Sequence, residues 1–404
     1  MASSNTQNCT ESEDNSKDDQ KRSPIKKQKV DHDLFKQTEI PCFEEKEERC
    51  SGTRSVYFSC FNPVWPILAC GLSGGTTLII EGEKKTDLVA TWENKRWFNI
   101  NATSATTDLG WNMNGTLLLT AFLDGKLVLW NKDTENLMEV NDTSGEQVWA
   151  IIWNPFLPYM FATRNNNTVL VWDNAKDQPR LLEKKFALHT STIMDFVWIS
   201  VDQFVSCSDD GIILLCHIEK DSPLKSFSHE EAILTLSWNN ISNLLGCLSR
   251  DGTLTVLSMT KNEPDFVSKN ERMKRPTCIA WYPTHSSQIT ESNSTLIACG
   301  MENGSVVFWD IRGKGDPVRY LLEQTNSIWD VSFSPDGRFL TSIDLQGELV
   351  IWSTETWEII FKSKLSFRAS KGILQWGGDG HKLAIANSSE QIHILEAVEA
   401  REKH

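Results

Sequence analysis

The chain has 404 residues, and its 40 Lys and Arg against 54 Asp and Glu give a formal net charge of −14. A content of 40% hydrophobic and 23% charged residues excludes wholesale disorder, and the lack of a long apolar run excludes a membrane-spanning helix. The acidic balance argues against sequence-independent DNA coating, which needs a basic surface. The 10 Cys are scattered without a C-x-x-C pair, and the polar N-terminus does not read as a signal peptide, so we expect reduced thiols.

Residues 1–49 differ from the rest of the chain. They hold 9 Lys and Arg, 12 Asp and Glu and few large apolar residues, which predicts a disordered polar tail. A compact basic cluster within it contains Lys26, Lys27 and Lys29. Such a cluster suits the acidic groove of an import receptor, so we interpret it as a nuclear localisation signal and expect the protein in the nucleus. The alternative is an ordinary solvated charge run.

The remainder of the chain is periodic. Eight markers, mostly Trp, each follow a short apolar segment and recur every 40–52 residues. The markers are Phe61, Trp111, Trp153, Trp198, Trp238, Trp281, Phe333 and Trp376. A second series closes four of the units, after Asp-Gly, Asn-Gly or similar turns: Trp130, Trp172, Trp309 and Trp352. This period with Trp-Asp endings is typical of WD40 blades. We predict an all-β, eight-bladed WD40 β-propeller over residues 50–397 and a C-terminal tail over 398–404.

The units depart from a full WD repeat in several places. Blade four has Cys216 where the closing Trp is expected, and blade seven has Gln346 at the expected turn Asp. The buried hydrogen-bond network of His, Ser or Thr, Asp and Trp is therefore broken in most blades, and apolar packing between blades carries more of the stability. We also expect the segment Ile40–Glu48 to supply the outermost strand of the last blade and close the ring, since its charges suit an exposed edge.

No residue pattern points to catalysis, so we expect no enzyme activity, no cofactor and no metal. The segment Gly71–Thr77 resembles a phosphate loop only superficially, because no Lys precedes its hydroxyl residues. Cys216 and His217 are adjacent, which is poor geometry for a metal site. Asp195 and Asp330 are better interpreted as acceptors of backbone hydrogen bonds than as an acid–base pair.

β-Propellers usually function by presenting a surface to which other molecules bind. Four residues before the markers the chain reaches the channel mouth, which places Tyr57, Trp149, Met194 and Trp329 at the rim. These side chains are candidates for a peptide-anchoring patch; alternatively, they plug the channel. Three arginines, Arg164, Arg250 and Arg275, are candidates for an anion-binding rim, because guanidinium groups bind phosphate bidentately. The alternative is three unrelated solvated side chains.

The blades also resemble one family in detail, the transducin-β-like corepressor subunits of F-box-like/WD-repeat type. The resemblance extends over residues 39–396. It is carried by Asp195–Trp198, Phe204–Asp210 and Cys216–Ile218 in blade four, Leu257–Met259 in blade five, the insertion between Trp281–Thr284 and Leu296–Ala298 in blade six, Ser334–Leu340 in blade seven, and Glu39–Pro41. The family's helical dimerisation module and F-box-like segment have no counterpart in the first 50 residues, which makes the chain a divergent member.

This resemblance implies a nuclear, non-enzymatic scaffold in transcriptional regulation. The expected partners are corepressor and histone deacetylase complex proteins, with histone tails as a further partner, and neither sequence-specific nucleic-acid binding nor a membrane. An acidic ring is compatible with a basic tail as partner. The alternative function is substrate recognition in a ubiquitin ligase, for which the three arginines would clamp a phosphopeptide.

Overall fold

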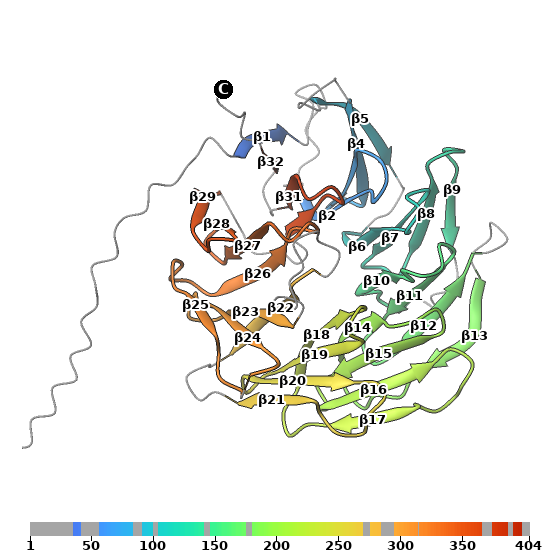
Figure 1. Cartoon of the computed structure of the whole chain (residues 1–404). Helices are drawn as coiled ribbons and strands as arrows, with labels where there is room; N and C mark the ends of the chain where they lie inside the picture. The colour runs from blue at the N-terminus through green and yellow to red at the C-terminus, as the bar shows by residue number, and fades with distance from the viewer. Residues whose placement is uncertain are drawn as a thin grey trace, which may run out of the picture.

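The computed structural model describes most of the repeat region and one N-terminal strand. The described residues are 35–41, 56–83, 91–99, 104–140, 146–174, 180–269, 275–283, 295–313, 315–365, 374–386 and 391–397. They form 32 strands in eight four-stranded antiparallel sheets, and no helix occurs among them. Figure 1 shows the eight sheets arranged as the blades of a ring. The prediction of an all-β, eight-bladed propeller is confirmed.

The first four blades follow one another along the chain, in the order of their marker residues. Blade one contains β2 (Val56–Phe61), β3 (Ile67–Leu72), β4 (Thr76–Glu83) and β5 (Thr91–Asn99). Blade two contains β6 (Thr106–Trp111), β7 (Leu117–Phe122), β8 (Leu127–Asn131) and β9 (Leu137–Val140). Blade three contains β10 (Ala150–Trp153), β11 (Met160–Arg164), β12 (Val169–Asp173) and β13 (Arg180–Phe186). Blade four contains β14 (Ile193–Trp198), β15 (Gln203–Ser208), β16 (Ile212–His217) and β17 (Lys225–Ser228).

The other four blades continue in the same order. Blade five contains β18 (Ile233–Asn239), β19 (Leu244–Ser249), β20 (Thr253–Ser258) and β21 (Phe266–Lys269). Blade six contains β22 (Pro276–Trp281), β23 (Leu296–Met301), β24 (Val306–Asp310) and β25 (Arg319–Leu321). Blade seven contains β26 (Ile328–Phe333), β27 (Phe339–Asp344), β28 (Glu348–Ser353) and β29 (Ile359–Lys364). Blade eight contains β30 (Leu374–Trp376), β31 (Lys382–Ala386), β32 (Gln391–Ala397) and β1 (Phe35–Pro41).

The last blade joins both ends of the described chain. β1 pairs with β32 in antiparallel register from Phe35 opposite Ala397 to Pro41 opposite Gln391. The ring is therefore closed by an N-terminal strand, as expected. The strand lies earlier than Ile40–Glu48, however, and residues 42–48 fall outside the described part of the chain. The segment that pairs with β32 is Phe35–Pro41, which precedes the charged residues Glu44–Glu48.

The marker residues occupy equivalent positions in their blades. Trp111 pairs with Leu118, which pairs with Trp130, and Phe333, Leu340 and Trp352 repeat the same three-strand row in blade seven. Cys216 takes the closing position of blade four opposite Phe204. The two Trp series are therefore in register across each blade, which explains their constant offset in the sequence.

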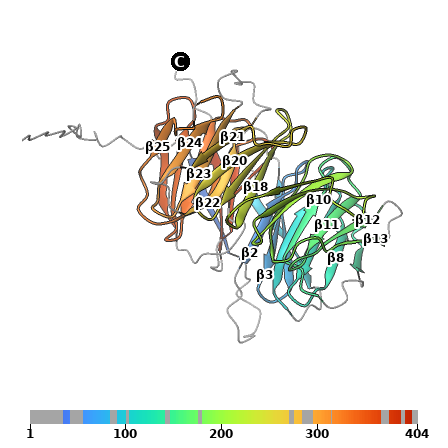
Figure 2. The same ribbon diagram turned by 90° about the horizontal axis from the view of Figure 1, so that it is seen from below.

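The core lies between blades. Eight large apolar clusters occur among the described residues, and each joins two neighbouring blades. One of them links Val56 and Leu78 of blade one with Ala384 and Ile394 of blade eight, so the closure is itself packed. Figure 2 shows the same sheets from below, after a turn of 90° from the view of Figure 1. Because both faces of a blade are buried, its strands are continuously apolar.

Candidate protein-binding rim of the channel

The inner strands carry a repeated irregularity at the predicted rim. In six blades the pairing of the first two strands skips one residue, which is the signature of a β-bulge. The skipped residues are Tyr57, Thr107, Met194, Leu234, Thr277 and Trp329. All six are partly exposed, whereas the residue before each of them is buried. The bulge thus leaves part of this side chain exposed, although Met194 and Trp329 also pack against the apolar clusters between neighbouring blades.

Blade three reaches the same place without a bulge. Trp149 directly precedes β10, and its backbone N–H donates to the carbonyl oxygen of Arg164 at 2.8 Å. Its side chain is 42% exposed, and its indole Nε1 donates to Asn166 Oδ1 at 3.1 Å. Tyr57, Trp149, Met194 and Trp329 therefore share one level of the ring, at the start of four different inner strands. Whether their apolar surface anchors a peptide or fills the channel stays a prediction.

An aspartate directly behind the bulge ties neighbouring inner strands together. Asp108 accepts the N–H of Leu109 and, through its other oxygen, the N–H of Ile151 in the next blade, both at 2.8 Å. Asp195 and Asp330 make the same pair of bonds to their own strand and to the next blade. The interpretation of Asp195 and Asp330 as backbone acceptors agrees with these contacts. Sequence reasoning missed Asp108, although all three lie three residues before their marker.

Burial changes the acidity of Asp330. Asp330 is enclosed between blades seven and eight, and this desolvation raises the pKa of its carboxyl to about 6, against the lowering by the N–H groups of Leu374 and Val331. Burial, then the charge of Asp330, raises the pKa of the neighbouring Cys278 thiol to about 12. The seven cysteines in the described part of the chain form no disulfide with one another, and five of them are buried. Cys278 is therefore a protonated packing residue.

The turns between the second and third strands add to the rim. Residues at equivalent turn positions donate their backbone N–H to the segment that leads into the inner strand: Leu123 to Ala105, Asp209 to Thr192, Arg250 to Ala232, Glu302 to Arg275 and Leu345 to Ser327. In blades two and seven this position is an exposed leucine. In blades four, five and six it is charged. Blades four to six therefore have charged residues at these turns, whereas blades two and seven have exposed leucines, a difference that the sequence reasoning did not identify.

The three candidate arginines each have a partner of their own. Arg164 Nη1 donates to the carbonyl oxygens of Ile193 and Met194 at the rim of the next blade. Arg250 forms an ion pair with Asp209 of the preceding blade, and Arg275 pairs with Glu302 at 3.2 Å. Two of the guanidinium charges thus already have a carboxylate neighbour, and Arg164 has a structural role. The anion-binding rim stays a prediction that these contacts do not favour.

Blade four contains a Ser–His–Asp row that has the connectivity of a catalytic triad. His189 Nε2 lies 2.9 Å from Ser206 Oγ, and Nδ1 lies 3.2 Å from Asp210 Oδ2. Burial lowers the pKa of His189, against the raising effect of Asp210. Ser206 is buried in the middle of β15, where a substrate cannot reach it. The row is therefore the part of the WD network that this blade retains, with Cys216 in place of the closing Trp.

Three further points concern metal sites, membrane-spanning helices and the localisation signal. No group of three or more His, Cys, Asp or Glu side chains that could hold a metal ion occurs in this part of the chain. The described residues also contain no helix long and apolar enough to cross a membrane. Lys26, Lys27 and Lys29 lie outside the described residues, so the localisation signal remains a prediction.

Comparisons with known proteins agree with this architecture. The sequence model of the family described as "WD domain, G-beta repeat" matches residues 315–353. The chain is 26% identical over 355 residues to F-box-like/WD repeat-containing protein TBL1X of Mus musculus, which covers 85% of this chain and 66% of that protein. The values for TBL1Y of Homo sapiens are the same. The chain thus spans just under two thirds of the length of these relatives.

A solved structure supports the fold independently. The C-terminal WD40 domain of Sif2 superposes with a TM-score of 0.71 at 18% identity, covering 91% of this chain and 99% of that domain. The repeat match at residues 315–353 falls within blades six and seven of the ring. The chain is a WD40 β-propeller protein and a divergent relative of the F-box-like/WD repeat-containing proteins.

Proposed function

We propose that this protein is a non-enzymatic scaffold in transcriptional regulation and that its channel rim binds a segment of a partner protein. The observation that carries the proposal is the set of partly exposed rim residues, Tyr57, Trp149, Met194 and Trp329, which the inner strands hold at one level. Aromatic and Met side chains at a rigid rim provide the large apolar contacts that anchor a bound peptide.

The class of partner follows from the relatives and from charge. The F-box-like/WD-repeat family implies corepressor and histone deacetylase complex proteins as partners, with histone tails as a further ligand. The net charge of −14 favours a basic segment, since complementary charge speeds encounter and excludes acidic competitors. Near the rim, Asp209 and Glu302 are already paired with Arg250 and Arg275, so the preference for a basic segment rests on the net charge of the chain. A basic peptide with an apolar anchor therefore fits the exposed rim residues and this net charge.

The test is purification of the tagged full chain from nuclear extract at moderate salt, with identification of the proteins that co-elute. We expect corepressor and histone deacetylase subunits with the wild type and their loss with Trp149→Ala. Tyr320→Ala is the matched control, because Tyr320 is an equally exposed aromatic residue in β25, the last strand of blade six. Recovery of the wild type without these subunits, or equal loss in both variants, would contradict the proposal.

The ubiquitin-ligase alternative makes a different prediction. It requires Arg164, Arg250 and Arg275 to engage a phosphopeptide, whereas Arg250 and Arg275 each pair with a carboxylate. Recovery of cullin-type ligase subunits alone in the same experiment would favour it. Nuclear localisation is tested separately: a fluorescent fusion with Lys26, Lys27 and Lys29 changed to Ala should lose nuclear enrichment, and retention in the nucleus would contradict the signal.

A further inference from the structure

The hairpins between the first and second strands form a second distinctive surface, at the opposite end of the inner strands from the rim. In five consecutive blades these hairpins expose large apolar side chains, each 36–56% exposed. We call them the hairpin arc: Val64 and Trp65 in blade one, Met113 in blade two, Phe156 and Tyr159 in blade three, Val201 in blade four and Ile241 in blade five.

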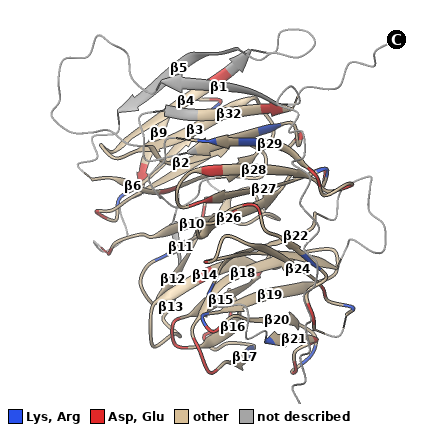
Figure 3. Cartoon of the chain, turned by 90° about the vertical axis from the view of Figure 1, so that its left-hand side faces the viewer, with Lys and Arg blue, Asp and Glu red and all other residues tan. Residues whose placement is uncertain are grey.

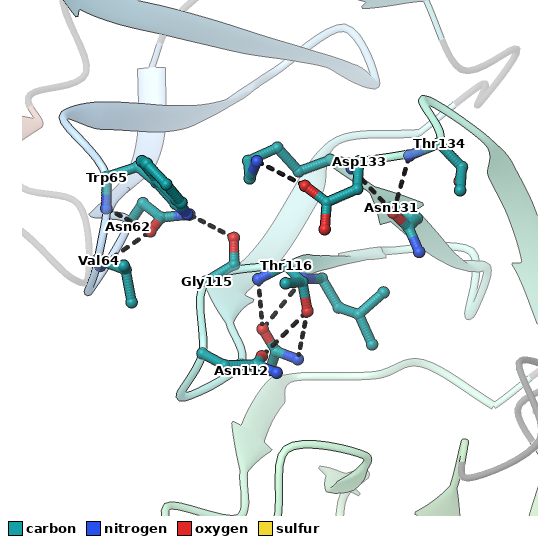
Figure 4. Close-up of polar contacts among 12 residues, drawn as sticks. Asn62, Val64, Trp65, Asn112, Gly115, Thr116, Asn131, Asp133 and Thr134 are labelled. Carbon is teal, nitrogen blue, oxygen red and sulfur yellow. Dashed lines mark hydrogen bonds and ion pairs between the residues drawn. The ribbon is translucent and has the colours of Figure 1, made fainter.

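The arc is continuous because side-chain amides connect its hairpins. Asn62 Nδ2 donates to the carbonyl oxygen of Gly115 in blade two at 2.7 Å, as Figure 4 shows. Asn112 donates to Pro158 in blade three at 2.9 Å, and Asn154 donates to Val201 in blade four at 3.1 Å. Each bond spans one blade boundary. The first four hairpins of the arc therefore lie side by side on one face.

Two of these asparagines, Asn62 and Asn154, and the equivalent Asn239 of blade five also bond to the backbone of the exposed residues. Asn62 Oδ1 accepts the backbone N–H groups of Val64 and Trp65 at 3.0 and 2.9 Å. Asn154 Oδ1 accepts that of Phe156 at 2.8 Å, and Asn239 Oδ1 accepts that of Ile241 at 3.2 Å. A surface that is ordered before it binds loses less conformational entropy on association.

The arc also carries little charge. The five hairpin segments 62–66, 112–116, 154–159, 199–202 and 239–243 contain one charged residue, Asp202, in a chain that is 23% charged. The Asp202 carboxylate is bonded to His217 at 3.1 Å, and Lys132, which lies over the Trp65 ring beside the arc, is paired with Asp133. The described hairpins of blades seven and eight contrast with them, because they carry Asp336, Arg338 and Asp379. Figure 3 shows how widely charged residues occur elsewhere on the molecule. Depletion of charge, with Trp, Tyr, Phe and Met in its place, is the composition of interface cores.

We propose that the hairpin arc is the contact surface between two copies of this chain. Two copies each bearing a net charge of −14 repel one another over most of their surface. They can approach most closely through a face that carries little charge and whose one hairpin carboxylate, Asp202, already has His217 as a partner. A two-fold dimer places the same patch on both partners, and a mainly apolar arc is complementary to itself. A basic partner, by contrast, would find only this one carboxylate among the arc hairpins.

The experiment measures the mass of the purified full chain by sedimentation equilibrium from about 1 to 200 µM, a range that brackets micromolar affinity. The wild type should pass from monomer to dimer, and 0.5 M NaCl should strengthen the dimer, because salt screens the repulsion while leaving apolar contact intact. Trp65→Ser with Phe156→Ser should weaken dimerisation at least tenfold. The control pair, Val318→Ser with Tyr320→Ser, removes equally exposed apolar groups beside β25 and should leave it unchanged.

Several results would overturn the proposal. They are a wild type that stays monomeric at the highest concentration, a dimer that salt dissociates, and a dimer that the control pair weakens as much as the arc pair does. Thermal melts of both pairs should match that of the wild type, which separates lost association from misfolding. Trp149→Ala should dimerise normally, so failure of the rim proposal and failure of this one can be distinguished.

Discussion

Asp195 Oδ2 lies 2.8 Å from the backbone nitrogen of Leu236, across the boundary between blades four and five. The same oxygen accepts the hydroxyl of Thr235 at 2.9 Å, while Oδ1 accepts the N–H of Phe196 at 2.8 Å. One carboxylate thus satisfies donors on two inner strands. Because a carboxylate in this position replaces backbone pairing that adjacent blades cannot make, it fixes the spacing of the blades at the rim.

Removal of this carboxylate should destabilise the ring. We expect Asp195→Ala to lower the free energy of unfolding by about 2–4 kcal/mol, since it leaves donors of both strands unsatisfied. Asp209→Ala is the control, because its ion pair with Arg250 is exposed and such pairs contribute about 1 kcal/mol or less. Urea unfolding followed by tryptophan fluorescence measures both. Equal effects of the two substitutions would contradict the role of Asp195.

A second prediction concerns the marker residues. Trp153 is buried between blades two and three, packs 5.1 Å from the ring of Phe161, and donates from Nε1 to the carbonyl oxygen of Gly110 at 2.8 Å. We expect Trp153→Ala to destabilise the protein by about 3–5 kcal/mol. Trp149→Ala removes the same side chain from an exposed position nearby and should change stability by less than about 1 kcal/mol. A thermal melt of Trp153→Ala that matches the wild type would contradict the core role.

The N-terminal strand allows a third prediction. Since β1 covers the outer edge of β32, a chain lacking residues 1–34 should melt like the full chain, whereas one lacking residues 1–41 should melt at least about 3 °C lower. Circular dichroism at a β-sheet wavelength measures both. Identical melting of the two truncated chains would show that closure does not depend on β1.

The sequence was sufficient to predict the ring because its signal is repeated. Markers such as Trp153 and Trp198 each lie at the end of an inner strand, and the closing residues Trp130, Trp172 and Cys216 occupy one register position opposite the second strand. A period that is imposed by eight similar blades survives the loss of individual signature residues. Cys216 can therefore replace a Trp without any change in the topology of its blade.

The details that depend on contacts between blades could not be predicted in the same way. The hydrogen bond from the backbone N–H of Ile151 to the Asp108 carboxylate joins residues of different blades, and nothing near Asp108 in the sequence indicates its partner. The hairpin arc is likewise a property of five loops that only the ring brings together. The closing strand was expected at Ile40–Glu48 because its charges suit an edge, but pairing with β32 selects Phe35–Pro41. Local sequence contains no information on that register.

The last prediction follows from the raised pKa of Asp330. Burial raises this pKa from the ordinary 3.8 to about 6, so the folded protein binds more protons than the unfolded chain between these two pH values. Stability from this group is therefore fully present below about pH 4 and declines as the pH rises through 6.

The side chain introduced by Asp330→Asn cannot ionise, so the variant lacks this decline. Relative to the wild type, the free energy of unfolding of the variant should rise by up to about 3 kcal/mol between pH 4 and pH 7. This value corresponds to the rise in the pKa of Asp330 from 3.8 to about 6. Urea unfolding of both proteins at these two pH values measures the difference, and the comparison cancels all other titrating groups. A constant difference between them would show that Asp330 ionises as readily in the ring as in the unfolded chain, held by the N–H groups of Val331 and Leu374 against the effect of its burial.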